Sequence, residues 1–381
     1  MNSRARRTGV AARVAAAGLL AAVVGSVPAA VADNDTDADA GWRLGLHSRQ
    51  HSDATALNLG RDPRAEDLAP RRGRNLAYID DEVRLERTHG AWTLGLLARS
   101  RATLVASAGT LALYRQVDGP DTLPADQRWT VDARFRGFSG GGLVFGRGHL
   151  LGAGWSARWE LQALVLQRWR ERRISGTAGD TAGTAGTAGA YDFALTSMQR
   201  DNGLRFPFQT AFAARGSALL GGAAVAWQGQ RWQFEVAVDD AGWQRWRGLP
   251  RQDAVLDSAT ATYDADGFVV YRPLVQGQNS QATATLAAPA WGRLAARWRV
   301  DPATGLGAEA GADLLPGFGA LPWLGLRLPA GNWQLALQWR THERRLTAQG
   351  AWRGLTLTAG ADRLGGNQQS REFGLAWALP I

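Results

Sequence analysis

The residues with the clearest capacity for chemistry in this sequence are arginines that share one face of a short segment. Arg293, Arg297 and Arg299 lie at odd positions of residues 291–300, and that segment contains no Asp or Glu. A guanidinium carries several N–H donors in a planar fork, which binds carboxylate and phosphate groups bidentately. If they line a water-filled interior, these three side chains predict a strip that attracts anions.

Further arginines fit the same interior face, but several of them lie close to an acidic residue. Asp132 precedes Arg134 and Arg136, and Glu160 follows Arg158. The alternative to anion binding is a structural ladder, in which the arginines pair across strands and hydrate the interior. Candidate partners in such a ladder are Glu235, Asp239, Glu160 and Asp132. The complete set that we expect to line the interior or bind anions is Arg293, Arg297, Arg299, Arg134, Arg136, Arg158 and Arg340.

Residues that would support catalysis or metal binding show no informative spacing. The five histidines form no H-E-x-x-H or similar ligand pattern. The chain has no cysteine, which excludes thiolate nucleophiles, cysteine metal sites and disulfides. We therefore expect no catalytic residue, no metal and no cofactor. A hydrolase built on a membrane barrel is the remaining enzymatic alternative.

The elements that must position these side chains follow from the spacing of the apolar residues. Apolar and polar residues alternate over many short stretches, which is the period of a β-strand with two different faces. Glycine-containing turns separate some of these runs, as at residues 88–91 and 228–230. The clearest alternating runs are 129–136, 232–239, 294–300, 333–340 and 373–379.

Alternation alone does not tell which face of the strands meets solvent. A soluble, secreted β-sandwich turns its apolar face inward, whereas a membrane barrel turns that face outward to lipid. The 17 tryptophans favour the barrel over the sandwich, because indole rings prefer the lipid–water boundary and many stand at the ends of alternating runs. We expect a girdle at that boundary formed by Trp129, Trp155, Trp227, Trp232, Trp291, Trp333, Trp339 and Trp377.

The predicted fold is all-β, a closed antiparallel transmembrane β-barrel that occupies residues 33–381 as one domain. At about 9–11 residues per tilted strand, this length accommodates roughly 14 to 18 strands. Polar, irregular pieces that interrupt the alternation predict long loops near residues 58–75, 173–190 and 242–271. The second of these pieces repeats Thr-Ala-Gly and offers few side chains for packing.

The start of the chain has the three parts of a secretory signal peptide. A basic start is followed by the apolar run 14–27 and by an A-x-A cleavage site at 30–32. We therefore expect residues 1–32 to be cleaved after export through the general secretory pathway. Removing the four arginines of this segment would lower the formal charge from +9 to +5. So modest a charge gives no support to nucleic-acid binding.

The C-terminal strand carries the most specific resemblance to a known class of proteins. Residues 371–381, Arg-Glu-Phe-Gly-Leu-Ala-Trp-Ala-Leu-Pro-Ile, place Phe373, Leu375, Trp377 and Leu379 on one face. The strand resembles the last strand of Gram-negative outer-membrane β-barrel proteins, the porin-like class in the broad sense. The resemblance implies that these four residues form the assembly signal read by the barrel-assembly machinery. The class usually ends in an aromatic residue, whereas this chain ends in Pro380-Ile381.

Two functions from different classes follow from this architecture. The first is an outer-membrane barrel, surrounded by lipid, that forms a passive or gated path for hydrophilic solutes, with an anionic solute or a glycan as the candidate ligand. The second is a non-conducting barrel that serves as a structural or docking component of an envelope export or surface-assembly system. The sequence does not identify a specific family within the class.

Overall fold

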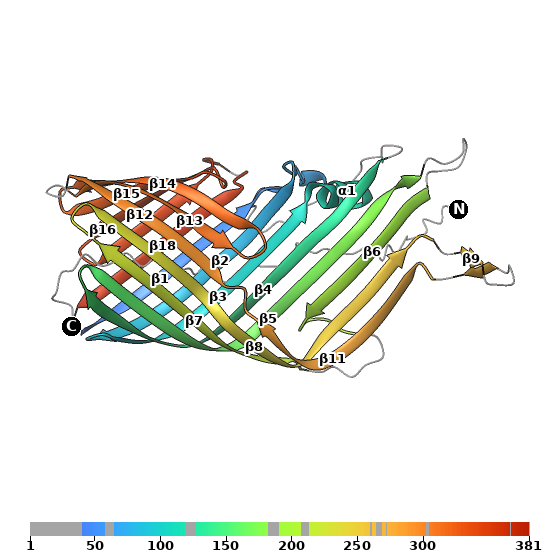
Figure 1. The fold of residues 1–381 in the computed structure, drawn as a ribbon, viewed down its shortest axis with the longest axis horizontal. Coiled ribbons are helices and arrows are strands. Elements are labelled where there is room, and N and C mark those ends of the chain that lie inside the picture. Colours follow the sequence, from blue (N-terminus) through green and yellow to red (C-terminus); the bar gives the residue numbers. More distant parts are fainter. Residues whose placement is uncertain are drawn as a thin grey trace, which may run out of the picture.

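The computed structural model shows a barrel formed by fourteen strands, with a sheet that continues beyond it on one side (Figure 1). The predicted signal peptide lies outside the described residues. No helix among the described residues is long and apolar enough to cross a membrane. The structure describes residues 40–57, 65–118, 127–181, 190–206, 213–259, 261–263, 269–271, 273–301, 305–365 and 367–380.

The barrel closes because its first and last strands pair with each other. Trp42 of the first strand lies opposite Leu379 of the last strand, in an antiparallel register. Every neighbouring pair in the ring is antiparallel, so no edge stays open around the barrel among the strands that the structure describes. The strands of the ring, in order, are β1 (Ala40–Ser52), β2 (Arg74–His89), β3 (Trp92–Ser107), β4 (Arg128–Gly152), β5 (Trp155–Thr181), β7 (Arg215–Gln228), β8 (Trp232–Asp257), β12 (Trp291–Asp301), β13 (Leu306–Leu315), β14 (Gly319–Ala330), β15 (Trp333–Arg340), β16 (Arg345–Trp352), β17 (Leu355–Ala361) and β18 (Ser370–Pro380).

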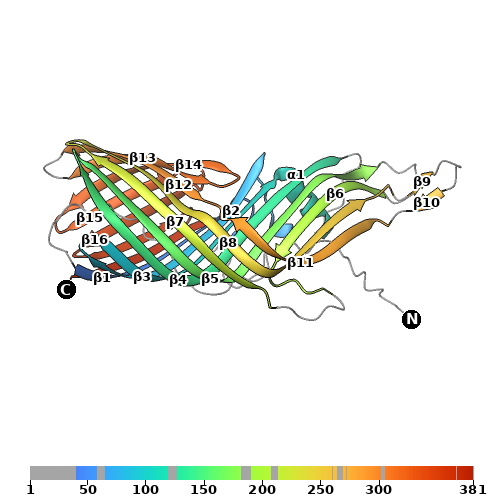
Figure 2. The same ribbon diagram turned by 60° about the horizontal axis from the view of Figure 1, so that its bottom comes forward.

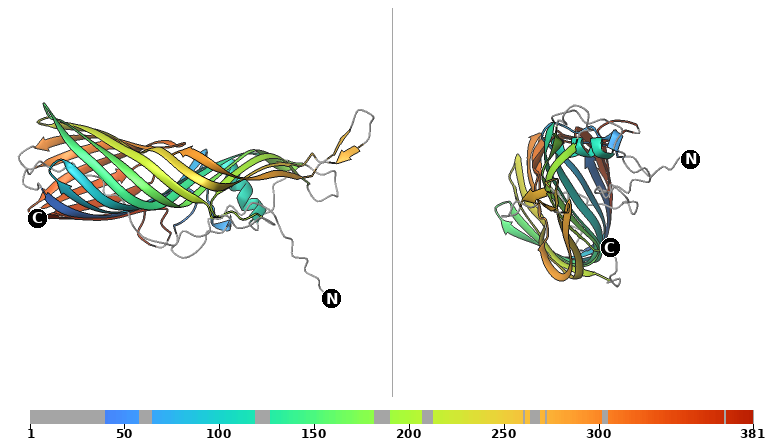
Figure 3. Two further views of the ribbon diagram at one scale, coloured as in Figure 1. Left: turned by 90° about the horizontal axis from the view of Figure 1, so that it is seen from below. Right: turned by 90° about the vertical axis from the view of Figure 1, so that its right-hand side faces the viewer.

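Three strands are roughly twice as long as the others and carry the sheet beyond the barrel (Figures 1 and 2). These are β4, β5 and β8, with 25, 27 and 26 residues. In this extension β6 (Ala190–Asp201) pairs with both β5 and β8, and β11 (Val275–Ala287) pairs with β8. A small hairpin of β9 (Ala261–Tyr263) and β10 (Val269–Tyr271) lies at its far end (Figure 3).

The two ends of the barrel differ in the connections between strands. At the end where β1 begins and β18 ends, the strands are joined by short turns such as 90–91, 153–154 and 353–354. At the other end the connections include η1 (Ala65–Asp67) between β1 and β2, and α1 (Ala108–Asp118) between β3 and β4. We call these the short-turn end and the long-loop end. Outer-membrane barrels place short turns in the periplasm and longer loops outside the cell.

The outward faces of the barrel strands are apolar. Leu96, Leu161, Val236 and Leu326, from strands spread around the ring, are 57, 47, 57 and 52% exposed. So continuous an apolar surface is far larger than the patches that soluble proteins expose, and it matches a lipid-facing band. Eight of the tryptophans with exposed side chains lie close to the short turns, as an aromatic girdle requires. They are Trp42, Trp92, Trp155, Trp232, Trp298, Trp333, Trp352 and Trp377.

Two of the three predicted loops are wrong over much of their length. Residues 173–181 continue β5 and pair with β6, and residues 242–257 continue β8 and pair with β7, β6 and β11. The glycines that suggested a loop serve close approach between strands. A Cβ at Gly242, for example, would collide with the carbonyl oxygen of Leu219. The remaining part of the second loop, 182–189, lies outside the described residues, as does 58–64 of the first.

Candidate functional site: the barrel lumen

The lumen contains a polar cavity of about 950 Å³ at the short-turn end. Alternation of the strands places charged side chains on its wall, because the residues between the lipid-facing ones must point inward. The wall carries nine arginines and eight acidic residues, so positive and negative charge are close to balance. Arg84 shows how the charges are arranged, since it contacts Glu82, Glu86 and Glu160 at 3.0, 2.9 and 2.6 Å.

Above this cavity, buried ion pairs cross the lumen between strands that lie far apart in the ring. Arg49 of β1 pairs with Asp313 of β13, and Arg340 of β15 binds the same carboxylate at 2.7 Å. On the other side, Asp240 of β8 accepts hydrogen bonds at 2.6 Å from both Arg99 and Arg101 of β3. We call this set the cross-lumen layer; its members are Arg49, Asp80, Arg99, Arg101, Asp240, Trp291, Asp313, Arg340 and Glu372.

Trp291 lies in the middle of the cross-lumen layer. Arg101 stacks over its indole ring with 4.3 Å between the guanidinium carbon and the ring centroid, and Arg49 lies 5.7 Å from the same ring. The ring of Tyr78, from β2, meets the indole edge-on at 5.9 Å. Because β12 and β2 are almost opposite in the ring, these contacts join opposite walls. A cation above an aromatic face stabilises such a desolvated arrangement.

Apolar clusters continue the filling of the interior toward the long-loop end. One cluster packs Phe138, Leu166, Trp169, Leu220 and Trp246 against the inner wall of β4, β5, β7 and β8. A second packs Leu76 and Tyr78 against Leu315 and Leu321. The interior therefore has three levels: a charged cavity, a layer of ion pairs and apolar clusters.

The structure places most of the predicted interior arginines on the inner face, next to acids on neighbouring strands. Arg293 lies 3.7 Å from Asp313, Arg297 lies 3.7 Å from Glu309, and Arg340 is a member of the cross-lumen layer. Arg158 lines the cavity 4.0 Å from Glu235, a partner that the ladder interpretation names. Arg299 is half-buried on the same face of β12 as Arg297.

Arg134 and Arg136 lie in the part of β4 near the long-loop end, away from the cavity at the short-turn end. Arg134 is exposed there, and Arg136 contacts Glu171 at 2.7 Å. Both side chains share the inner face of the sheet with Phe138, so they are inward-facing residues of the rim. The strip of unpaired arginines that the sequence suggested on β12 is instead interleaved with acids from β13, because Arg293 and Arg297 lie directly opposite Asp313 and Glu309.

Six of the eight tryptophans predicted for the girdle lie on the outer surface. Trp155, Trp232, Trp333, Trp339 and Trp377 are exposed, and Trp227 is half-buried against Phe234. Contact of these rings with lipid remains a prediction. Trp291 and Trp129 contradict the predicted girdle, because their side chains are buried, at 5 and 4% exposed. Trp291 has the inward parity of Arg293, and α1 approaches Trp129 at Gly109.

The predicted assembly signal forms the paired strand β18. Phe373, Trp377 and Leu379 are 46, 47 and 42% exposed on its outer face, and Leu375 is half-buried. The inner face of the same strand carries Glu372, which joins the cross-lumen layer through Arg340. Recognition of this strand by an assembly machinery remains a prediction.

A cluster of two histidines and one aspartate, which the sequence did not single out, forms near the long-loop end. The Nε2 atoms of His51 and His342 lie 2.9 and 3.1 Å from the two carboxylate oxygens of Asp53. Burial raises the pKa of Asp53, but the hydrogen bonds with His342 and His51 outweigh it and hold the pKa well below its ordinary value. Arg71 also binds this carboxylate, at 2.7 Å. The arginine already neutralises the carboxylate, whereas Nδ1 of His51 is buried without a hydrogen-bond partner among the described residues.

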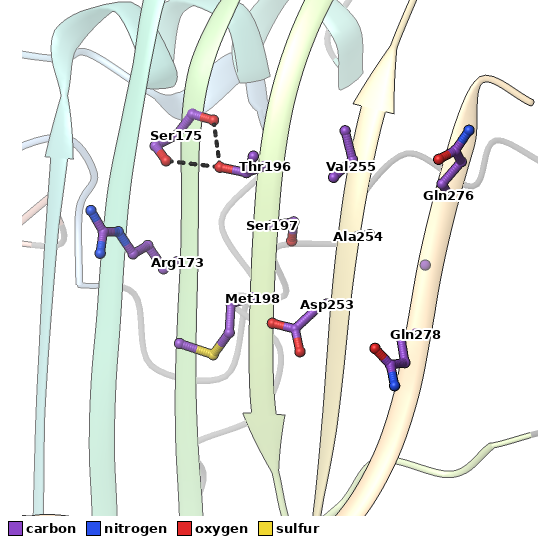
Figure 4. Close-up of a pocket in the computed structure, with 11 residues that line it drawn as sticks. Arg173, Ser175, Thr196, Ser197, Met198, Asp253, Ala254, Val255, Gln276 and Gln278 are labelled. Carbon is purple, nitrogen blue, oxygen red and sulfur yellow. Dashed lines mark hydrogen bonds between the residues drawn. The ribbon is translucent and has the colours of Figure 1, made fainter. Parts of the chain in front are cut away.

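A shallow groove of about 660 Å³ crosses the extension over β5, β6, β8 and β11 (Figure 4). Its lining is mostly polar and includes Arg173, Asp253, Gln276 and Gln278. The hydroxyl groups of Ser175 and Thr196 lie 3.1 Å apart across β5 and β6 (Figure 4). This groove lies on the face of the sheet that continues the inner wall of the barrel.

The members of the cross-lumen layer on β2 and β3 could have been predicted from the sequence by comparing two neighbouring strands, although neither strand alone indicates them. Asp80 and Glu82 alternate on one arm of the predicted hairpin at 88–91, and Arg101 and Arg99 alternate on the other. The structure pairs Asp80 with Arg101 and Glu82 with Arg99. Complementary charges on facing arms of a hairpin would have predicted an interior ion-pair layer. The contribution of Asp240, from a distant strand, had no such local signal.

Comparison with known proteins finds similarity at the level of overall architecture. The TodX deltaS2S3 mutant monoaromatic hydrocarbon channel aligns over 90% of this chain and 91% of its own, with 9% identity and a TM-score of 0.42. A FadL homologue of Pseudomonas aeruginosa aligns over 90% of both chains, with 12% identity and a TM-score of 0.39. The toluene transporter TbuX of Ralstonia pickettii aligns over 90% of both chains, with 8% identity and a TM-score of 0.33. No protein-family model and no curated protein sequence matches the chain.

The class of the protein follows from the geometry of the barrel itself. A closed antiparallel ring with an apolar outer band, tryptophans near the short turns and a charged interior defines a β-barrel of the outer-membrane class. The predicted fold class is thus confirmed, with fourteen strands in the ring at the lower end of the predicted range.

Proposed function

We propose that this chain is a Gram-negative outer-membrane barrel, exported by the general secretory pathway, that provides a gated path for hydrophilic solutes. The observation that carries the proposal is the order of the levels in the lumen. A charged cavity of about 950 Å³ ends at the cross-lumen layer, whose members all project from strands of the barrel wall. The layer and the apolar clusters beyond it are both formed by side chains of the barrel strands, so a path to the long-loop end requires side-chain rearrangement at both levels.

The charged wall of the cavity supports the passage of small polar solutes. We further propose that the cavity prefers anions. The nine arginines of the wall are matched in number by its eight acidic residues together with Asp240, which binds Arg99 and Arg101. Arg297 and Arg299 lie further along β12 toward the short turns, on the inner face of the strand. Guanidinium groups would lower the barrier for carboxylate or phosphate groups, including those of acidic glycans.

Conductance across a planar bilayer tests the gate. Trp291→Ala removes the indole that joins opposite walls, so we expect ion conductance of the variant to exceed that of the unmodified protein several-fold. Trp298→Ala is the matched control, because Trp298 lies on the same strand and is 39% exposed on the lipid-facing side. A folded Trp291→Ala barrel that conducts no better than the control would overturn the gated path.

The anion preference has a separate test in the reversal potential measured across a KCl gradient. The double substitution Arg297→Ala, Arg299→Ala should shift the permeability ratio toward cations. Glu309 keeps Arg327 as a partner at 3.1 Å, so the barrel retains a paired acid at this position. An unchanged ratio would remove the anionic solute from the proposal and leave the gated path intact.

The extension favours a second candidate, a non-conducting barrel that docks other envelope components. Its polar groove and the outer edge of β11, which pairs only with β8 among the described strands, lie beyond the lipid-facing band. Conductance separates the two candidates. The first requires that opening the cross-lumen layer creates a path, whereas the second predicts a closed barrel in every folded variant.

A further inference from the structure

On the outer surface of three adjacent strands, a row of arginines lies just beyond the lipid-facing band, on the side of the long-loop end. On β5 the outward side chains Leu161 and Val165 are 47 and 70% exposed. One extra residue, Gln167, then interrupts the pairing, because Ser139 lies opposite Arg168 and Gly140 lies opposite Leu166. Such a bulge reverses the faces of the strand. Beyond it Trp169 points inward, and Arg168, Arg170 and Arg172 point outward.

The two neighbouring strands make the same change at the same height. On β7 the outward residues pass from Leu219 to Arg215, and on β8 they pass from Trp243 to Arg245 and Arg247. Pairing aligns these residues across the strands, with Ser217 opposite Arg245 and Arg215 opposite Arg247. We call the six side chains the outer arginine patch: Arg168, Arg170, Arg172, Arg215, Arg245 and Arg247.

The patch carries a large excess of positive charge. Its acidic neighbour is Asp201, which is 3% exposed and lies 3.0 Å from both Arg168 and Arg170. Burial and the charge of Arg170 lower the pKa of Arg172, while Asp201, 3.9 Å away, raises it. Within the described part of the chain, Arg215, Arg245 and Arg247 form no ion pair, and all three are exposed. One buried carboxylate therefore stands against six guanidinium groups.

The position of the outer arginine patch indicates which part of the membrane it contacts. Trp243, 65% exposed, marks the end of the apolar band on β8, and the patch begins two residues further along the strand. It lies on the side of the long-loop end, where an outer-membrane barrel passes through the outer leaflet. Lipid headgroups lie at this height, and guanidinium groups bind phosphate bidentately.

We propose that the outer arginine patch binds the phosphate groups of a phosphorylated glycolipid in the outer leaflet. The proposal rests on the outer-membrane location given under the proposed function, but not on conduction through the lumen. Arg215, Arg245 and Arg247 supply the exposed donors, and Asp201 holds Arg168 and Arg170 in place beside them. The lipid's acyl chains then lie along the apolar band below, against Val165, Leu219 and Trp243.

Binding to the full-length protein in detergent micelles tests the proposal. The probe is bisphosphorylated lipid A, compared with the same lipid after removal of both phosphates, and lipid-bound species are counted by native mass spectrometry. We expect the bisphosphorylated lipid to bind at least about tenfold more tightly, because each arginine near an anionic surface contributes a favourable electrostatic increment. The triple substitution Arg215→Gln, Arg245→Gln, Arg247→Gln should abolish that difference.

The matched control removes three exposed arginines at the other end of the barrel. Arg87→Gln, Arg231→Gln, Arg353→Gln changes the net charge equally, and all three residues lie at or beside short turns. We expect this control to bind the lipid as the unmodified protein does. The proposal is overturned if the patch variant binds like the control, or if both phosphorylated and dephosphorylated lipids bind alike. It is also overturned if inorganic phosphate displaces the lipid with equal affinity, since the patch is then a site for free anions. Barrel assembly and conductance are measured on the same samples, so failure of the proposed function is seen separately.

Discussion

The arginines inside the barrel and those of the outer arginine patch are the same residue type in opposite surroundings. Inside, Arg99 and Arg101 share the carboxylate of Asp240, and all three side chains are almost completely buried. Outside, Arg215, Arg245 and Arg247 are exposed and line one edge of an apolar band. The inner arginines satisfy the acids of the chain itself. The outer ones leave their donors for something that the chain does not supply.

The position of an arginine relative to the barrel wall, rather than the number of arginines, therefore determines what its side chain binds. A buried guanidinium without its carboxylate is strongly destabilising, and the buried arginines of the cross-lumen layer are each matched to an acid. An exposed guanidinium remains hydrated and requires no partner. The bulge at Gln167 separates the two situations along a single strand, because it turns Trp169 inward and its arginine neighbours outward.

Deletion of Gln167 should have the largest effect, because it would remove the bulge that separates inward-facing from outward-facing residues on β5. Without the extra residue there are two alternatives. The inward and outward faces of β5 exchange beyond Leu166, or the strand loses its pairing with β4. Arginines would then enter the apolar cluster around Trp246. We expect no folded barrel, measured as loss of the faster-migrating band of an unboiled sample in electrophoresis. Gln167→Ala keeps the residue count and should fold normally; a deletion variant that also folds normally would show that the bulge does not set the faces.

Asp240→Asn should have the next largest effect, because it leaves Arg99 and Arg101 without the carboxylate that they share. The residue has a positive φ of 62°, which Asn tolerates well, so the substitution tests charge rather than backbone conformation. We expect the free energy of unfolding to fall by about 3–5 kcal/mol. Urea titration of the barrel refolded into lipid vesicles measures the change. A loss under about 1 kcal/mol would mean that the buried pairs do not need the charge of Asp240.

Arg245→Gln should have the smallest effect and sharpens the comparison from the outer side. Its guanidinium is exposed and forms no ion pair among the described residues. We expect the free energy of unfolding in vesicles without phosphorylated glycolipid to change by less than about 0.5 kcal/mol. Urea titration measures this variant and Arg99→Gln, its counterpart inside the barrel, under the same conditions. Equal losses for the two variants would erase the distinction between inner and outer arginines.

The architecture could be predicted from the sequence because alternation and tryptophan placement are local properties. Runs such as 232–239 and 333–340 became strands with the predicted outer face, and the turns at 88–91 and 228–230 join strands as expected. The parity rule also identified Arg293 and Arg297 as inward-facing. Trp291 shares their parity, so its placement in the girdle ignored a signal that the sequence contained.

Features that depend on pairing between distant strands could not be predicted in the same way. Asp313 meets Arg49 only because β13 faces β1 across a closed ring. The extension escaped prediction because glycine and small polar residues, as at 173–181, look like a loop until a partner strand is known. The bulge at Gln167 is likewise visible only in the register between β4 and β5.

The apolar faces of these strands point outward, as a lipid-facing surface requires, and the charged faces point inward. Electrophoretic mobility in SDS of the membrane-extracted protein, with and without boiling, tests this orientation most directly. The protein should be recovered with membranes, and the unboiled sample should migrate faster, as a compact barrel that resists detergent. Identical mobility of the two samples, with the protein recovered in the soluble fraction, would contradict this orientation.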